Sequence, residues 1–174
     1  DILDMSRIES GKMELNYEAM DLEQQLSNLE SLFRAQAEAK NLVLTFDNDY
    51  RKKRLLRADS LRLNQILVNI IGNAIKFTET GRVAVSANML EEEPRALIRF
   101  SVTDTGIGIE PAALRRIFNA FEQADALTAS RHGGTGLGLS ISSRLVQMMG
   151  GTLEVRSEPD QGSEFFFTLS LEYA

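Results

Sequence analysis

Residues 69–78 read NIIGNAIKFT and lie within a longer run whose apolar residues recur at helical spacing. Asp59 precedes this run and is a residue type that caps helix N-termini. On a helix Asn69 and Asn73 project from the same face because they are four residues apart, and Lys76 lies on roughly the same side. Carboxamide oxygens suit magnesium, and an ammonium can meet phosphate oxygens. The alternative is an ordinary amphipathic helix carrying two exposed asparagines.

On either side of this helix, the spacing of apolar residues predicts further helices and strands. Helices are expected at 21–39, where Asp21 and Gln24 form a capping-box-like pair, and at 137–149. Strands are expected at 12–20, 42–47, 81–90, 96–104, 152–158 and 163–173, with a short helix after Pro111. The sequence therefore predicts an α/β protein, a two-layer sandwich with a mixed sheet of about five strands packed on about three helices.

Three glycine-containing motifs follow the asparagine helix. DTGIGI begins at Asp104, at the end of a predicted strand, where a carboxylate could accept a hydrogen bond from an exocyclic amine. Its Gly106 and Gly108 permit close backbone approach. HGGTGLGL (132–139) opens a helix, so its free N–H groups could face a phosphate. QGSEF (161–165) enters a strand. Taken singly, each motif can also be an ordinary turn or loop, as can the only histidine, His132.

The bulk composition narrows the class of protein. The 174 residues are 43% hydrophobic and 25% charged, as in soluble globular domains. A net charge of −6 argues against nucleic acid as the main partner, and the lack of cysteine excludes disulfides and thiolate chemistry. No apolar run approaches the roughly 20 residues of a membrane span. The chain begins at DILDMSRIES without an initiator Met, so we expect it to be a piece of something larger.

In combination, the ordered motifs NxxxNAxKFT, DTGIGI, FNAFEQAD, GGTGLGL and GSEF resemble the N, first-glycine, F, second-glycine and third-glycine boxes of sensor histidine kinases. DILDMSRIESGK resembles the linker that ends their second dimerisation helix. The resemblance spans essentially the whole chain. It implies a Bergerat-type ATP-binding fold over residues 13–174, preceded by the end of the dimerisation helix and a linker at 1–12.

The resemblance also assigns roles. Asn73 would bind Mg²⁺, Asp104 would accept a hydrogen bond from the adenine amine, and Phe118 and Phe121 would anchor an ATP lid. The implied catalytic residues are Asn69, Lys76 and Arg131. The implied nucleotide-binding residues are Asn69, Asn73, Lys76, Asp104, Gly106, Gly108, Ile109, Phe118, Phe121, Gly134, Thr135, Gly136, Leu137 and Gly138.

The function implied by the resemblance is that of a protein-histidine kinase. The domain would bind Mg-ATP and donate the γ-phosphate to a histidine on a dimerisation helix, for relay to a response regulator or receiver domain. These 174 residues do not include that helix, so we expect no self-labelling. The parent would be a homodimer, with Ile2, Met5 and Ile8 in its interface, and would hold this domain on the cytoplasmic side of the inner membrane.

Two rival functions share the same fold. The gyrase-type and chaperone ATPases carry a glutamate as general base four residues before the magnesium-binding asparagine, where this chain has Asn69, which cannot take a proton. Hydrolysis as the main function is therefore disfavoured. The other rival is a degenerate kinase that binds nucleotide or docks a partner without transferring phosphate.

Overall fold

A five-stranded mixed sheet forms one layer of the computed structural model, which describes residues 2–50, 54–119 and 137–174. The strand order is β2-β4-β5-β7-β6. Only β2 and β4 are parallel, and the remaining neighbours are antiparallel. The strands are β2 Val43–Asn48, β4 Arg82–Glu91, β5 Ala96–Asp104, β7 Gly162–Leu171 and β6 Glu154–Glu158. The predicted mixed sheet of about five strands is confirmed.

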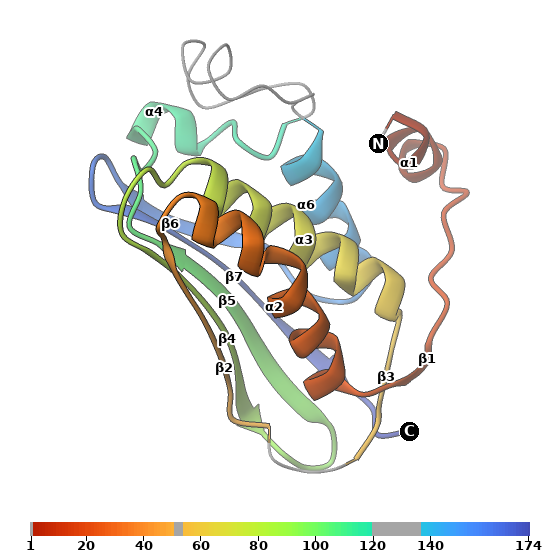
Figure 1. Ribbon diagram of the computed structural model, residues 1–174. Helices are drawn as coiled ribbons and strands as arrows, with labels where there is room; N and C mark the ends of the chain where they lie inside the picture. The colour runs from red at the N-terminus through yellow and green to blue at the C-terminus, as the bar shows by residue number, and fades with distance from the viewer. Residues whose placement is uncertain (1, 51–53, 120–136) are drawn as a thin grey trace.

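Three helices form the second layer and cover one face of the sheet (Figure 1). They are α2 Leu22–Ala39, α3 Ser60–Lys76 and α6 Gly138–Met148. Shorter elements surround this sandwich: α1 Ile2–Glu9, α4 Pro111–Leu114, and a ribbon of β1 Glu18–Met20 with β3 Leu56–Ala58. No helix in the described part of the chain is long and apolar enough to cross a membrane.

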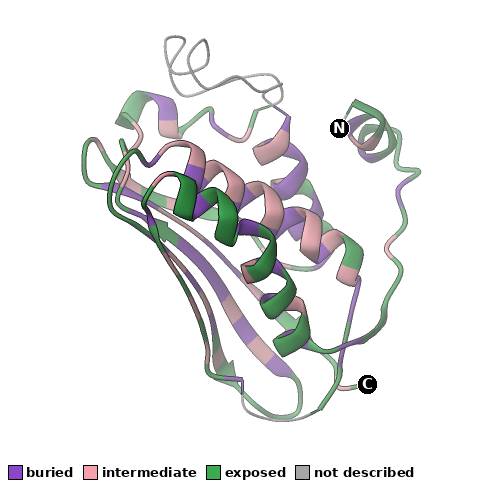
Figure 2. Cartoon of the chain, viewed as in Figure 1, coloured by how far each residue is buried: buried purple, intermediate pink, exposed green. Residues whose placement is uncertain are grey.

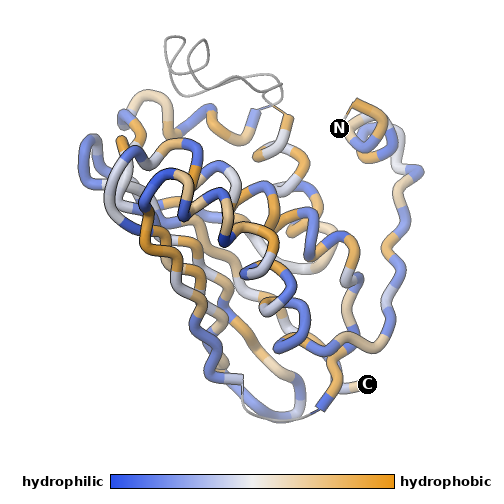
Figure 3. The backbone as a smooth tube through the Cα atoms, viewed as in Figure 1, coloured by the Kyte–Doolittle hydropathy of each residue, from blue (hydrophilic) through white to orange (hydrophobic). Residues whose placement is uncertain are grey.

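Helix α3 is stabilised by an N-cap at its start and by an apolar stripe that packs into the core. The Asp59 side chain accepts a hydrogen bond from Arg62 N at 3.0 Å, as an N-cap should. The stripe is fully buried and consists of Leu63, Ile66, Leu67, Ile70, Ile71, Ala74 and Ile75. Buried residues are concentrated where the helices meet the sheet, and apolar and polar stretches alternate along the helices (Figures 2 and 3). The polar face of α3 is thereby left at the surface.

The sheet contributes aromatic side chains to the same core. Phe100 on β5 and Phe167 on β7 are direct cross-strand partners, and their rings stack with centroids 5.1 Å apart. Both are fully buried. This pair fixes β5 against β7, and so fixes the end of β5 where Asp104 stands.

Two local predictions are corrected. The strand predicted at 12–20 is limited to Glu18–Met20, because the N–H groups of Lys12 and Met13 instead bond to Arg7 O at the end of α1. In the capping box, Asp21 accepts from Gln24 N as predicted, but the Gln24 side chain bonds to Asn28 rather than back to the cap. These corrections concern side-chain and backbone hydrogen bonds that alternation cannot show.

The apolar stripe on α1, expected in a homodimer interface of the parent, is mostly buried within this single chain. Met5 and Ile8 are each only 8% exposed and belong to the core of this chain, whereas Ile2 is 68% exposed. Asp4 bonds to Gln65 at 2.9 Å and pairs with Arg62 at 3.5 Å, which ties α1 to α3. Two of the three apolar residues therefore pack within the chain itself.

Candidate functional site

The C-terminal half of α3 presents the polar side chains that the sequence singled out. Asn69, Asn73 and Lys76 are all partly exposed, in contrast to the buried stripe on the other side of the helix. The helix ends at Lys76, and its C-cap Phe77 donates its N–H to Asn73 O at 2.9 Å. The Lys76 ammonium lies 5.5 Å from the centre of the Phe77 ring. The structure therefore places the three predicted side chains on one partly exposed face.

Asp104 ends β5 as a buried carboxyl group. It is 7% exposed and accepts the N–H of Gly106 at 2.9 Å. Burial raises its pKa above the ordinary aspartate value, and hydrogen bonds from the backbone of Gly106 and Ser163 only partly offset that increase. A buried carboxylate is costly unless a donor satisfies it, so this site is suited to a ligand that brings an N–H donor.

The DTGIGI loop packs directly against the end of α3. A Cβ added at Gly106 would collide with Phe77 O and come within 2.8 Å of Thr78 Oγ1, so only glycine fits. Ile107 donates its N–H to Phe77 O at 3.3 Å. The two motifs, well separated in sequence, therefore form one continuous backbone surface.

The second half of the same loop is held by β6 and β7. Gly108 has a φ of +70°, and a Cβ there would collide with Glu158 O. Ile109 donates its N–H to Ser157 Oγ at 2.8 Å. Both predicted residues are thus positioned by the β6–β7 hairpin.

Helix α6 approaches Asn69 at its N-terminus. Asn69 Nδ2 donates to Ser142 Oγ at 3.1 Å, and a Cβ added at Gly138 would collide with Asn69 Oδ1. Leu137, the N-cap residue, is fully buried. The positive end of the α6 dipole therefore lies beside the polar face of α3, an arrangement that favours an anion there.

Of the predicted lid residues, only Phe118 can be placed. Its ring packs edge-on against Phe165 of β7 at a centroid distance of 6.4 Å. Five predicted residues lie outside the described part of the chain: Phe121, Arg131, Gly134, Thr135 and Gly136.

Sequence reasoning missed several residues that build the site. A Cβ at Gly162, whose φ is +105°, would collide with Asp104 O. Thr78 is fully buried, donates to Ala74 O at 2.7 Å and faces Gly106. In the sequence, these residues were visible only as the glycine of GSEF and the threonine of KFT. Neither motif indicates that Gly162 packs against Asp104 or that Thr78 faces Gly106.

The described residues are suited to a metal ion that binds together with a phosphate-bearing ligand. They include no group of three or more His, Cys, Asp or Glu side chains that could hold an ion. Mg²⁺ usually keeps several waters and takes one or two protein ligands together with substrate phosphates. The amide oxygen of Asn73 fits that pattern, whereas a resident all-protein metal site does not.

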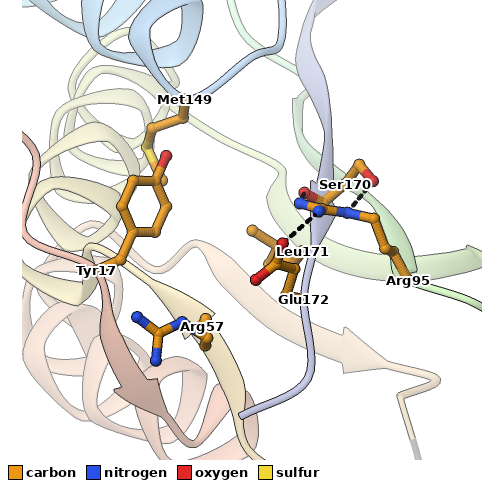
Figure 4. Close-up of a pocket in the computed structure, with 7 residues that line it drawn as sticks. All are labelled: Tyr17, Arg57, Arg95, Met149, Ser170, Leu171 and Glu172. Carbon is orange, nitrogen blue, oxygen red and sulfur yellow. Dashed lines mark hydrogen bonds and ion pairs between the residues drawn. The ribbon is translucent and has the colours of Figure 1, made fainter.

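A separate hollow of about 290 Å³ is lined by Tyr17, Arg57, Arg95, Met149, Ser170, Leu171 and Glu172 (Figure 4). It lies at the far end of the β5–β7 pair, because Ala96 pairs with Leu171 whereas Asp104 pairs with Ser163. Arg95 is bonded there to Ser170 and Glu172. The hollow is therefore no part of the site around Asp104.

Comparison with known proteins places this geometry in a family. Residues 58–173 match the family described as "Histidine kinase-, DNA gyrase B-, and HSP90-like ATPase". The chain is 44% identical to the sensor protein GacS of Pseudomonas syringae pv. syringae over 100% of this chain and 19% of GacS. It is 40% identical to the signal transduction histidine-protein kinase BarA of Escherichia coli K12 over 99% of this chain and 19% of BarA.

Solved structures of histidine kinases have the same fold as this chain. Full-length ShkA in complex with AMPPNP superposes with a TM-score of 0.86 at 38% identity, covering 99% of this chain and 35% of ShkA. The catalytic domain of histidine kinase ThkA superposes with a TM-score of 0.74 at 25% identity, covering 90% of this chain and 96% of that domain. The chain spans about a fifth of the length of the curated relatives it matches.

Proposed function

Because the chain belongs to the family of histidine kinase-, DNA gyrase B- and HSP90-like ATPases, as the ATP-binding catalytic domain of a two-component sensor histidine kinase, we propose that it binds Mg-ATP beside Asp104 and donates the γ-phosphate to a histidine. The observation that carries this proposal is the buried Asp104 carboxyl, beside which Gly106 and Gly162 allow the end of α3 and the start of β7 to pack closely. ShkA, which is solved with AMPPNP, superposes over nearly the whole chain.

Asp104 would recognise the adenine base. Its carboxylate is buried and can accept a hydrogen bond from the exocyclic amine, while Gly106 lets the loop pack against Phe77 O at the end of α3 and donates its N–H to the same carboxylate. Guanine would present a carbonyl oxygen to the same carboxylate. A site built around such a hydrogen bond can reject the wrong ligand by about 10⁴-fold or more, so ATP should be strongly preferred over GTP.

The partly exposed face of α3 would hold the phosphates. Asn73 would ligate Mg²⁺, whose charge would help to neutralise the triphosphate. Lys76 would contact a phosphate oxygen, with Asn69 in support, and the N-terminus of α6 at Gly138 would add its positive dipole end. Phosphoryl transfer depends mainly on such positioning and charge neutralisation, and these groups would supply both.

Hydrolysis of ATP by a positioned water is not favoured. The general base of a hydrolase would have to stand at Asn69, whose amide cannot accept a proton. Asn69 is also engaged by Ser142 and packed against Gly138. These contacts support a positioning role for the residue.

The remaining assignments extend the proposal to the whole protein. The acceptor would be a histidine in the dimerisation domain of the same protein, which would be a homodimer, and a response regulator or receiver domain would take the phosphate onward. Residues 1–12 would be the end of the dimerisation helix and its linker, and residues 13–174 the catalytic domain. The domain would lie on the cytoplasmic side of a membrane-anchored parent.

The test is calorimetric titration of the chain with Mg-ATP, Mg-GTP and ATP in EDTA. Mg-ATP should bind selectively, with affinity lost in Asp104→Ala and weakened in Asn73→Ala. Transfer would then be tested by adding the dimerisation domain in trans with radiolabelled ATP. Equal affinity for GTP, or no nucleotide binding by a folded chain, would refute the proposal.

A further inference from the structure

The last turn of α3 leaves four backbone carbonyls without partners inside the helix, as every α-helix does. Two are satisfied locally: Asn73 O accepts from Phe77 N at 2.9 Å, and Ala74 O accepts from Thr78 Oγ1 at 2.7 Å. The other two, Ile75 O and Lys76 O, receive one ammonium from outside. Lys40 Nζ donates to them at 2.7 Å and 3.3 Å.

Lys40 is itself rigidly placed. It is the C-cap of α2, and its N–H bonds to Ala37 O at 3.1 Å. Leu42 N also returns to Ala37 O, at 2.9 Å, and Asn41 adopts a φ of +55°, which together form a Schellman-type end. The backbone of Lys40 is therefore fixed, and its side chain links the end of α2 to the end of α3.

This link reaches the turn of α3 that carries two of the residues proposed to hold the phosphates and Mg²⁺. Asn73 and Lys76 belong to the same final turn whose carbonyls Lys40 binds. The C-terminus of a helix carries partial negative charge, which would repel a triphosphate, and a cation at that end offsets it. Lys40 thus holds the carbonyls of this turn in place and offsets the partial negative charge at the end of α3.

We propose that Lys40 is a positioning residue for nucleotide binding, which acts through the last turn of α3 on Asn73 and Lys76 without touching the ligand. The proposal rests on the phosphate and magnesium roles given above to Asn73 and Lys76. It predicts a specific pattern: loss of Lys40 weakens binding of the triphosphate while binding of the nucleoside part at Asp104 is spared.

The experiment measures Mg-ATP affinity by calorimetry and adenosine affinity by NMR titration for wild type, Lys40→Met and Lys40→Arg. The matched control is Lys12→Met, which removes an exposed lysine near α1. Lys40→Met should weaken Mg-ATP binding about three- to tenfold, with adenosine binding changed by less than about twofold. Lys40→Arg keeps the charge and the donors, so it should retain most of the affinity, and Lys12→Met should match wild type.

Equal losses for Mg-ATP and adenosine in Lys40→Met would overturn the proposal, because general loosening of the fold would produce that pattern. Unchanged Mg-ATP affinity would overturn it as well. If Lys40→Met does not fold, Lys40→Gln replaces it, since its amide can still donate to a carbonyl but carries no charge.

Two further variants separate this inference from the proposed function. If Asn73→Ala and Lys76→Ala bind Mg-ATP like wild type, the roles proposed for those residues are wrong. If both variants lose affinity and Lys40→Met does not, only the inference about Lys40 fails.

Discussion

Asp104 links the stability of the fold to the proposed binding of nucleotide. Its pKa is raised, chiefly by burial, so the folded protein holds the proton more tightly than the unfolded chain. The stabilisation from this group is therefore full below the ordinary aspartate pKa and is lost as the pH rises through the raised pKa of the folded state. The proposed hydrogen bond from the adenine amine requires ionised Asp104, so the protein form proposed to bind nucleotide is the less stable one.

We predict that Asp104→Asn gains stability relative to wild type as the pH rises. Asparagine has no charge to bury, so the variant lacks the penalty that wild type incurs when Asp104 ionises. The free energies of unfolding, measured in urea from about pH 4 to about pH 7, should diverge in favour of the variant toward neutral pH. Parallel curves for the two proteins would contradict the raised pKa.

Gly162 provides a second prediction at this scale. Gly162→Ala forces a side chain into a φ of +105° and into collision with Asp104 O, so it should cost more than the roughly 1–3 kcal/mol of backbone strain alone. Gly150→Ala is the matched control, because Gly150 has a φ of +92° but nothing within 4 Å of the added Cβ. Urea unfolding should show a larger loss for Gly162→Ala, and equal losses would mean that the contact with Asp104 O carries no cost.

These residues also show where sequence reasoning ends. Asp104 and Gly106 could be singled out because their motif is contiguous in the sequence, and the roles proposed for them come from the resemblance to histidine kinases. Ser142 could not, because it meets Asn69 across 73 residues of chain. The collision that requires glycine at position 162 likewise depends on how β7 pairs with β5, which no local pattern determines.

At the scale of elements, helix α1 is held by one face only. Ile8 is 8% exposed and Ile2 is 68% exposed on the same short helix. We predict that Ile8→Ala destabilises the docked helix by about 2 kcal/mol or more, whereas Ile2→Ala changes stability by less than about 0.5 kcal/mol. Amide hydrogen exchange across residues 2–9 should accelerate in Ile8→Ala alone. Equal exchange in the two variants would mean that α1 does not pack as described.

Elements with a capping residue and a clear apolar stripe could be predicted closely. The α3 helix was expected to follow the Asp59 cap and to carry Asn69, Asn73 and Lys76, and it runs from Ser60 to Lys76. The segment at 12–20 could not be predicted, because a strand exists only where a partner pairs with it. Glu18–Met20 finds that partner in β3, and the residues before it do not.

At the scale of the whole molecule, the composition and motifs predicted the two layers but not the strand order. The chain places β7 between β5 and β6 and pairs β2 in parallel with β4. That order brings Gly162 and Ser163 beside Asp104 at one end of β5, opposite the end of α3. The site is therefore a product of the topology, assembled from segments across the chain.

Because the site joins α3, α6 and the β5–β7 pair, ligand binding should stabilise the whole domain. A ligand that binds only the folded state adds about 2.7 kcal/mol at a concentration 100 times its Kd. For a domain of this size, that corresponds to a rise in Tm of about 5–11 °C. Differential scanning calorimetry should show this rise with Mg-ATP, a smaller one with ATP in EDTA, and almost none with Mg-GTP at the same concentration. Asp104→Ala, scanned as the control, should not respond to Mg-ATP. A rise of equal size with GTP, or one that persists in Asp104→Ala, would mean that the stabilising ligand binds somewhere other than the surface formed by Asp104, Gly106 and the end of α3.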